Sequence, residues 1–487
     1  MTNLKELFKK TSHYTVAKFA IMAAGFVSYP ILTRALHPHE YGIMGITVAL
    51  LNIFVGIAKM GMGTSIVRLW PEWEKKDGGV SKFVLTIFIS IILISLPLII
   101  LFDLGTYLLS SRIEKYLAFF FLLASPLILT RALNSYGLAL LQAREWSKAR
   151  AFFEVLTSYA AMILSVIGAT VLIGNLLGYY VGLIVGEAAV SAILVFYVLR
   201  GVRLRRASFS RPLLFEAISF GFPIALYELS GVLLYSGDRF IIMSLLGETA
   251  VGYYTVAFNL VQYIHVIFTV PIVMAVGPMV AKLCEKEGTE AASIFLRKVA
   301  RFFFLFALPA LTGLTVIRGD LVAVLASEQF LPGASLVHIL LASFLLAGSR
   351  DIFCLGMFLK KRTWLLAQIN LAGAGLNLIL NFILIPYYGL NGAAYATLLS
   401  QLVITIVAWR MSARLVPISL DILAFMKHAL AALAMATAIY YLVPEHRAVR
   451  LATRLFAGLS IYGIILLFID GNVRNMAKKV VNGLRKN

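Results

Sequence analysis

Charge is scarce in this chain, and acidic charge is the scarcest. Only 14% of the 487 residues are charged, with 23 Asp and Glu against 43 Lys and Arg, whereas 61% are hydrophobic. This balance lies far outside that of a soluble globular domain and indicates a polytopic membrane protein.

Cysteine is almost absent. Cys284 lies beside a charged segment and Cys354 lies within an apolar run, so the two predict neither a disulfide framework nor a metal site. His37 and His39 share a short segment in which Glu40 is the acidic neighbour, and no metal site is predicted there either. No cofactor is expected.

Two features that are typical of ATP-driven pumps and of membrane enzymes are missing as well. No G-x-x-x-x-G-K-[ST] loop occurs, which argues against an ATP-driven pump. The longest connection expected outside the membrane, residues 318–336, carries Arg318, Asp320 and Glu328 as its charged residues. A membrane glycan polymerase or ligase would need an extended outer loop rich in acids or arginines. The sequence therefore predicts a protein that is not an enzyme.

Long apolar runs, in contrast, recur along the whole chain. A helix needs about 20 apolar residues to cross the hydrocarbon core of a bilayer. Fourteen such runs are present, at Thr11–Thr33, Gly42–Gly61, Phe83–Leu104, Tyr116–Leu138, Phe152–Ile173, Tyr179–Leu199, Leu214–Tyr235, Val251–Met274, Val299–Ile317, Val337–Phe358, Leu365–Ile385, Ala393–Met411, Ile422–Leu442 and Leu451–Ile469. Between the second and third, TSIVRLWPEWEKK (residues 64–76) is expected to lie as an amphipathic helix on the cytoplasmic interface. We expect an all-α polytopic membrane protein of about 14 transmembrane helices.

Basic residues predict which side of the membrane each loop faces, because Lys and Arg are enriched in cytoplasmic loops. With the N-terminus inside, 31 of the 43 Lys and Arg residues fall in cytoplasmic segments, 8 in outer segments and 4 within spans. Both termini are therefore predicted to be cytoplasmic, with MTNLKELFKK leading into an uncleaved first span. The same distribution explains the net charge of +20 without a nucleic-acid partner.

A weak internal repeat divides the spans. LHPHEYG from Leu36 and LGETAVG from Leu246 share a Leu and a Gly six residues apart, ending at Gly42 and Gly252. These two segments lie 210 residues apart, and the sixth and twelfth spans align at an offset of 214 residues, which pairs Gly178 with Gly392. Such repeats are typical of transporters built from two bundles. We expect one six-helix bundle in residues 1–205, a second in residues 206–415, and two appended helices with a basic cytoplasmic tail in residues 416–487.

Several short stretches occur in order through both halves: ILTRALHPHEYG, GMGTSIVRLWPEWE, FGFPIAL, SGDRFIIMSLLGETAVGYYTVAF and IPYYGLNGAA. In this order they resemble the polysaccharide transporter (Wzx-like oligosaccharide flippase) family of the multidrug/oligosaccharidyl-lipid/polysaccharide exporter (MOP) superfamily. The resemblance implies a multi-pass flippase of the inner (plasma) membrane. Its implied substrates are polyprenyl-pyrophosphate-linked oligosaccharide units, such as those of lipopolysaccharide O-antigen, moved from the cytoplasmic to the outer leaflet by alternating access. Its implied partners are H⁺ or Na⁺ as coupling ion, membrane lipids and polysaccharide assembly proteins.

A lipid-linked pyrophosphate needs cations in a water-filled cavity, because it brings negative charge into the bilayer. Arg131 lies deep in the fourth span with Asn134 on the same face, and both are predicted to bind substrate. Arg350 of the tenth span and Lys18 of the first are further candidates. A structural pair with a buried carboxylate is the alternative for Arg131, and neutralisation by its acidic neighbour is the alternative for Arg350. Snorkelling to the interface is the interpretation favoured for Lys18 and Lys59 alike, with contact to the pyrophosphate at the cytoplasmic mouth as the other role for Lys18.

Carboxylates inside spans indicate ion coupling, because an acid that exchanges H⁺ or Na⁺ can link transport to a gradient. Glu228 follows Pro223 in the seventh span, Glu187 follows a glycine-rich run in the sixth, and Asp238 precedes Arg239 at the end of the seventh. All three acids are candidates. A structural salt bridge or hydrogen bond is the alternative for Glu228 and Glu187, and mutual neutralisation with Arg239 is the alternative for Asp238.

Two other transport functions stay open. A multidrug or metabolite exporter of the same superfamily would typically have twelve spans, so the two appended spans argue against it. A peptidoglycan-precursor lipid flippase shares the mechanism, and the motifs do not separate it from an oligosaccharide flippase.

Overall fold

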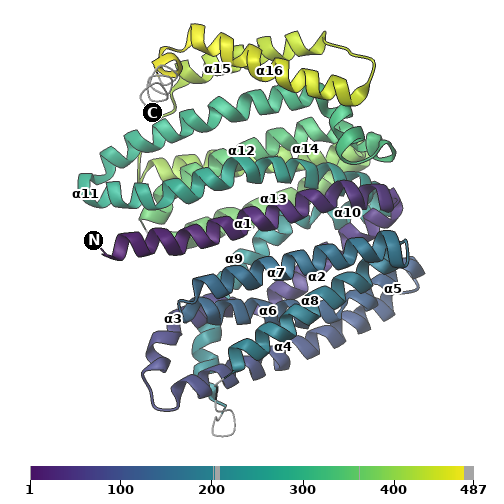
Figure 1. Cartoon of the computed structure of the whole chain (residues 1–487), viewed down its shortest axis with the longest axis vertical. Coiled ribbons are helices and arrows are strands. Elements are labelled where there is room, and N and C mark those ends of the chain that lie inside the picture. Colours follow the sequence, from purple (N-terminus) through teal and green to yellow (C-terminus); the bar gives the residue numbers. More distant parts are fainter. Residues whose placement is uncertain (1, 201, 203–208, 361, 476–487) are drawn as a thin grey trace. The chain divides into compact units, whose positions relative to one another are not determined.

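The computed structural model describes residues 2–200, 202, 209–360 and 362–475, and every regular element within them is helical (Figure 1). Contacts divide the chain into two compact units, Met1–Gly252 and Tyr253–Asn487. The expected basic tail beyond residue 475 and the loop at residues 203–208 lie outside the described residues.

The first unit consists of ten α-helices, one π-helical turn and the start of an eleventh helix. They are α1 (Thr2–Ala35), α2 (Pro38–Lys59), α3 (Met62–Glu74), α4 (Gly79–Leu109), α5 (Lys115–Ala124), α6 (Pro126–Ala143), α7 (Ser147–Ile167), η1 (Gly168–Leu172), α8 (Leu176–Leu199), α9 (Arg211–Ser236) and α10 (Asp238–Leu246). The second unit contains most of α11 (Glu248–Leu325), then η3 (Glu328–Gly333), α12 (Ala334–Leu359), α13 (Thr363–Tyr388), α14 (Leu390–Ala413), α15 (Ile422–Tyr440) and α16 (Arg447–Ile469).

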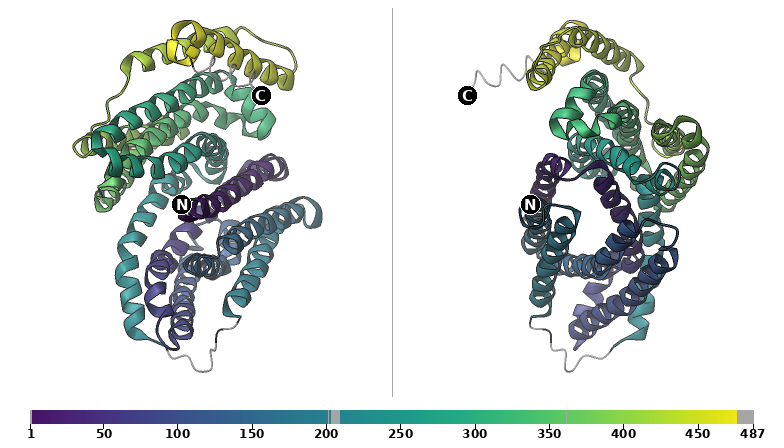
Figure 2. Two further views of the ribbon diagram at one scale, coloured as in Figure 1. Left: turned by 60° about the vertical axis from the view of Figure 1, so that its left-hand side comes forward. Right: turned by 90° about the vertical axis from the view of Figure 1, so that its right-hand side faces the viewer.

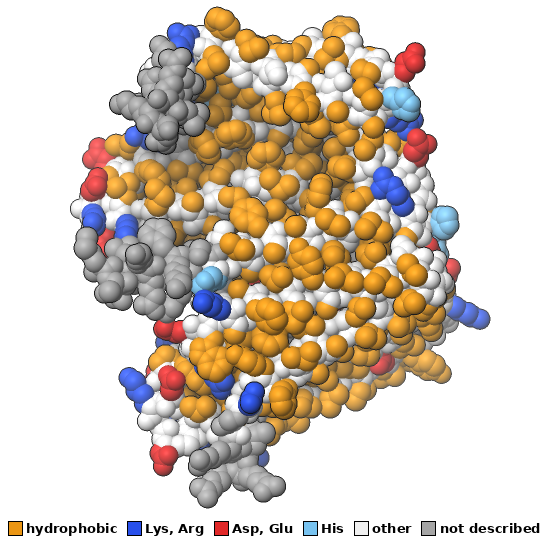
Figure 3. Space-filling view, in the orientation of Figure 1, with side chains coloured by type: hydrophobic (Ala, Val, Ile, Leu, Met, Phe, Trp, Pro, Cys, Tyr) orange, Lys and Arg blue, Asp and Glu red, His pale blue; other side chains and the backbone are white. Residues whose placement is uncertain are grey.

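The expected all-α membrane fold is confirmed. In the described part of the chain, 13 helices are long and apolar enough to cross a membrane. One of them, α11, has 78 residues with a break at Gly288 (φ 86°) and covers two of the fourteen expected spans. Figure 3 shows apolar side chains along the flanks of the helices and charged side chains mostly near their ends. A surface of this kind suits contact with lipid.

The second span is broken after Lys59, and a second helix follows it. α2 ends at Lys59, Met60 and Gly61 take left-handed backbone angles (φ 48° and 64°), and α3 follows at once. A Cβ atom at Gly61 would lie 1.9 Å from the Gly221 carbonyl oxygen of α9, which leaves room for glycine alone. The helix expected over residues 64–76 is α3, which packs against α6 and α9 with Trp70 only 3% exposed; its place on the cytoplasmic interface stays a prediction.

The two glycines of the internal repeat lie against each other. A Cβ atom at Gly42 of α2 would stand 1.8 Å from the Glu248 carbonyl oxygen, and one at Gly252 of α11 would stand 1.9 Å from the Pro38 carbonyl oxygen. The contact is reciprocal, since each glycine meets the carbonyl group four residues before the other. The short repeat therefore marks the place where the backbones of α2 and α11 touch.

The boundary between the compact units lies beyond the expected end of the first bundle. α9 and α10, expected to open the second bundle, pack on α2, and α9 also packs on α3 and α4. Both helices therefore belong to the first unit, which ends at Gly252. The division at residues 205 and 415 rests on the repeat and stays a prediction.

In the second unit, α15 and α16 pair as a hairpin (Figure 2) and pack on the later half of α11. The Tyr462 hydroxyl of α16 donates to the Leu305 carbonyl of α11 (2.7 Å), and the Thr312 hydroxyl of α11 donates to the Ala432 carbonyl of α15 (3.1 Å). The two helices that the sequence suggests are appended are thus docked on α11.

Buried ion pairs hold α16 to α11 near both of its ends. Arg301 Nη2 lies 2.6 Å from Asp470 Oδ2. Asp320 lies 2.6 Å from Arg450 Nη2 and 3.2 Å from Arg454 Nη1. Asp470 is 2% exposed and Asp320 is 8% exposed. We call these five residues the α11–α16 clamp. Since the sign of the charge on each helix changes between the two ends, the clamp specifies the direction in which α16 docks.

Candidate functional site

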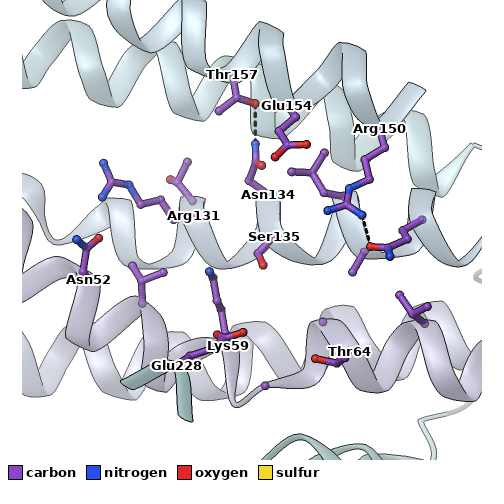
Figure 4. Close-up of a pocket in the computed structure, with 18 of the residues that line it drawn as sticks. Asn52, Lys59, Thr64, Arg131, Asn134, Ser135, Arg150, Glu154, Thr157 and Glu228 are labelled. Carbon is purple, nitrogen blue, oxygen red and sulfur yellow. Dashed lines mark hydrogen bonds between the residues drawn. The ribbon is translucent and has the colours of Figure 1, made fainter. Parts of the chain in front are cut away.

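A cavity of about 740 Å³ lies among α2, α3, α6, α7, α8 and α9, all within the first unit (Figure 4). Its charged lining residues are Lys59, Arg68, Arg131, Arg150, Glu154, Glu187 and Glu228. Its polar lining includes Asn52, Thr64, Asn134, Ser135 and Thr157. A pocket of this size with several convergent polar groups is the first candidate for a binding site.

Arg131 is positioned by a break in the fourth span. α5 ends at Ala124 and α6 begins at Pro126, because proline suits the first turn of a helix and not its interior. The Arg131 guanidinium, in the second turn of α6, forms a bidentate pair with Glu187 of α8, with Nε–Oε2 2.9 Å and Nη2–Oε1 2.8 Å. Two residues predicted for different roles thus form one ion pair on the cavity wall, which largely neutralises both charges.

Asn134 and Lys18 are held by α7 on the same side of the cavity. The Asn134 amide donates to Thr157 Oγ1 (2.9 Å), and both residues line the cavity. Lys18 of α1 reaches the site through Glu154, since its Nζ lies 3.2 Å from Glu154 Oε1. Lys18 therefore neutralises one of the lining acids, with its own side chain 58% exposed.

Lys59 and Arg68 also line the cavity, although the sequence favours snorkelling for Lys59 and places Arg68 in a cytoplasmic loop. Lys59 ends α2 at the break, and Figure 4 shows its ammonium group pointing toward Ser135. No described residue forms a hydrogen bond or ion pair with that ammonium group. The Arg68 guanidinium lies 4.2 Å from the centre of the Phe220 ring. In the sequence, Lys59 directly precedes MGMG (residues 60–63). Glycines that interrupt an apolar run indicate a broken span, and this pattern could have identified Lys59 as a cavity residue.

Glu228 of α9 lies beside Lys59 in the same cavity (Figure 4). Within the described ranges its carboxylate has neither a hydrogen bond nor an ion pair. The Glu228 carboxylate and the Lys59 ammonium group therefore lie in the same cavity without fixed partners among the described residues.

Arg350 and Asp238 lie away from this cavity. Arg350 of α12, in the second unit, is 7% exposed and donates to Gln401 Oε1 and Asp351 Oδ1, both at 3.4 Å. Asp238, at the start of α10, is fully buried and accepts from the Arg239 backbone N–H (2.8 Å). The structure thus brings four of the seven predicted site residues to one cavity, with Lys18 one contact away.

The charge that remains in the cavity is positive. Glu187 compensates Arg131, and Lys18 compensates Glu154. The lining holds three further basic residues, Lys59, Arg68 and Arg150, and one further acid, Glu228. Walls of low dielectric constant strengthen such an excess, so the arrangement suits an anionic group.

Comparisons with known proteins bear on the chain's family. The family described as "Polysaccharide biosynthesis protein" matches residues 7–284. "Probable flippase AglR" of Haloferax volcanii is 24% identical over 253 residues, which cover 50% of this chain and 52% of that protein. The chain thus matches about half the length of this relative.

Solved structures share the fold. "Lipid II flippase MurJ, inward closed conformation" superposes with a TM-score of 0.78 at 17% identity, covering 93% of this chain and 98% of that one. An inward-facing MATE family multidrug resistance transporter of the MOP superfamily gives 0.63 at 18% identity, covering 82% and 94%. A MOP superfamily transporter from Pyrococcus furiosus gives 0.52 at 16% identity, covering 83% and 92%. At these identities the likeness concerns the fold.

Proposed function

Because the chain belongs to the polysaccharide biosynthesis protein family and has the fold of MOP-superfamily transporters, we propose that it flips a polyprenyl-pyrophosphate-linked oligosaccharide from the cytoplasmic to the outer leaflet. The protein is a multi-pass membrane transporter of the flippase type. The pyrophosphate and its first sugars enter the cavity of the first unit, while the polyprenyl chain stays in lipid. Alternating access of the cavity then carries the head group across.

The observation that carries this proposal is the cationic cavity with an uncommitted Lys59. A pyrophosphate carries negative charge that must be compensated inside the bilayer, and a lysine ammonium group is a frequent phosphate ligand. Lys59 has no fixed partner among the described residues, and Arg68 has only the Phe220 ring. These two side chains are free to bind phosphate without first breaking an ion pair.

Arg131 plays a different part in this proposal. Its bidentate pair with Glu187 fixes α6 against α8 and holds Asn134 and Ser135 of α6 toward the cavity (Figure 4). These polar groups suit sugar hydroxyls. Replacing Arg131 alone would leave Glu187 without its partner and lower the free energy of unfolding by about 3–5 kcal/mol. A loss of transport in Arg131→Gln would therefore not distinguish a folding defect from a transport defect.

Ion coupling is proposed for Glu228. When ionised, Glu228 competes with the pyrophosphate for Lys59, and when it takes up H⁺ or Na⁺, the competition ends. Substrate binding and ion binding then favour each other, so the affinity for each depends on whether the other is bound. Glu228→Gln is expected to transport at a rate that no longer depends on an imposed pH or Na⁺ gradient. Unchanged gradient dependence would contradict this role.

A cationic cavity bears differently on the two alternatives. It disfavours the amphipathic cations that multidrug exporters carry, because Lys59, Arg68 and Arg150 would repel them. It does not distinguish an oligosaccharide carrier from a peptidoglycan precursor, since both present a pyrophosphate on a polyprenol. Substrate choice must then come from the sugars.

The test is translocation of a fluorescent polyprenyl-pyrophosphoryl oligosaccharide across proteoliposomes. Lys59→Gln is expected to slow transport about ten- to a hundredfold, because a hydrogen bond to a charged group contributes about 1.5–3 kcal/mol. The matched control is Lys76→Gln, at an exposed lysine that follows α3 and lies over the Trp73 ring; it should transport like the wild type. Parallel assays use a lipid II-type glycolipid and a cationic dye.

Each assay outcome has one meaning. Transport of the oligosaccharide lipid by Lys59→Gln at the wild-type rate would remove Lys59 from the mechanism. Transport of the lipid II-type glycolipid alone would replace the proposed substrate by a peptidoglycan precursor. Transport of the dye alone would make the protein a drug exporter.

A further inference from the structure

Three metal-ligating side chains from separate parts of the chain meet at one end of the first unit. His39 lies in the first turn of α2, Glu114 directly precedes α5, and Glu248 opens α11. One ligand atom from each lies within 4.8 Å of the others. His39 Nε2 is already 3.1 Å from Glu114 Oε2, close to the separation of about 3.3 Å between two ligands of a tetrahedral zinc ion.

The packing of α2 on α11 fixes two of these ligands. The Gly42–Gly252 contact brings the two backbones together within one turn of His39 and Glu248. On the third side, the Tyr116 ring at the start of α5 stacks on the His39 imidazole (centroids 6.2 Å apart, planes at 18°). The His39 ring thus has an aromatic neighbour outside the ligand set.

The negative charge of the two carboxylates at this point is only partly compensated. Glu114 and Glu248 bring two carboxylates together, and among the described residues His39 is the one basic side chain paired with either. Glu40 adds a third carboxylate nearby and is held by the backbone N–H groups of His37 and Leu176. Each acid lies near a helix N-terminus, which favours it locally, but that preference does not explain why three helices converge on one point.

We propose that His39, Glu114 and Glu248 bind a divalent transition-metal ion such as Zn²⁺ or Mn²⁺. One imidazole nitrogen with two carboxylate oxygens suits these ions, whereas Ca²⁺ and Mg²⁺ prefer oxygen ligands alone. Three protein ligands leave positions for water. The side chains of His39 and Glu114 are 38% and 44% exposed, so the ion exchanges with the solution and the site differs from a closed structural zinc centre.

A bound ion would join the starts of α2, α5 and α11. α11 continues from the first unit into the second, so an ion on Glu248 restrains the helix that connects the two. The start of α2, which carries His39, is predicted to face outside. The metal ion is therefore expected to act from the outer side and to slow transport, whichever substrate the protein carries.

Spacing along the chain argued against a metal site here because the ligands are distant in sequence. His39 and Glu114 are 75 residues apart, and Glu248 lies in a different helix again. Only the fold brings them together.

The test is titration of the purified full-length protein in detergent with Zn²⁺, and separately with Mn²⁺, by isothermal calorimetry. One ion is expected to bind per chain. Its affinity should fall at least tenfold in each of His39→Ala, Glu114→Gln and Glu248→Gln. His446→Ala, an exposed histidine before α16 in the second unit, is the matched control and should bind like the wild type.

Two results would overturn the site: a wild-type protein that binds neither ion, or binding that survives all three substitutions. Should one variant fold poorly, His39→Gln provides a conservative replacement, and the wild-type titration alone still decides whether an ion binds. Because binding is read without substrate, failure here leaves the proposed transport function untouched, and failure of that function leaves this site intact.

Discussion

At the scale of single residues, Gly42 and Gly252 mark a place where two helix backbones come very close in the first unit. The reciprocal approach leaves no space for a Cβ atom on either side, because each added carbon would stand within 2 Å of a carbonyl oxygen. Neither residue has a left-handed φ, so the requirement comes from packing alone.

Gly42→Ala is expected to lower the free energy of unfolding by about 1–3 kcal/mol or more, the usual cost of overpacking. Gly105→Ala in α4 is the control, since nothing lies within 4 Å of a Cβ atom there, and it should be neutral or gain up to about 1 kcal/mol from better helix propensity. Thermal unfolding followed by size-exclusion chromatography in detergent measures both. Equal unfolding midpoints for Gly42→Ala and wild type would mean that α2 and α11 separate easily.

The sequence identifies individual candidate residues of the cavity, but it does not predict which of them form ion pairs with each other. Arg131 and Glu187 stand out because charged residues are rare inside apolar spans, yet they are 56 residues apart and nothing local links them. Lys59 lines the cavity but was not predicted to do so, because a basic residue near a span end suggests snorkelling. The break at Met60 and Gly61 changes that interpretation, since it turns Lys59 into the cavity.

At the scale of elements, the helices themselves could be predicted well. Each span is a run of about 20 apolar residues, and in lipid such a run has almost no alternative to a helix. What could not be predicted is where a span divides or joins. α5 and α6 divide the fourth span, and α11 joins two spans through Gly288, because such local backbone choices depend on neighbouring helices.

The α11–α16 clamp leads to a prediction about the docked hairpin. Burial opposes ionisation of Asp470, but hydrogen bonds from Arg301 and His428 lower its pKa to about 2. Arg301→Gln would leave this buried carboxylate without its main partner and is expected to cost about 3–5 kcal/mol in the free energy of unfolding.

The control for that prediction is Arg297→Gln, one turn earlier on α11. Arg297 is exposed, so its replacement should change stability by no more than about 0.5 kcal/mol. Urea unfolding of both variants in detergent gives the comparison. Equal stability of the two variants would show that the clamp contributes little and that apolar packing alone holds α16.

At the scale of the whole molecule, the orientation in the membrane follows from the uneven distribution of Lys and Arg. It can be tested on the native chain, since Cys284 is partly exposed and Cys354 is buried. Cys284 lies in α11 before Gly288, in a segment predicted to be cytoplasmic. A membrane-impermeant maleimide is expected to label inverted vesicles and not intact cells.

Cys284→Ser is the control for this experiment and should abolish labelling, because Cys354 is only 7% exposed. Labelling of intact cells would reverse the orientation and with it the predicted direction of transport. The fold would be unaffected, since helix packing does not depend on which side is cytoplasmic.

The order of synthesis gives the clamp a further consequence. Arg450, a partner of Asp320, lies 130 residues later in the chain, and Asp470, the partner of Arg301, lies 169 residues later. At about 5–20 residues per second, the ribosome needs roughly 7–26 seconds to reach Arg450 and roughly 8–34 seconds to reach Asp470. Throughout that interval Arg301 and Asp320 of α11 lack their partners on and beside α16, so the direction of docking is fixed only after α16 has been synthesised. The α15–α16 hairpin therefore docks on α11 late in synthesis.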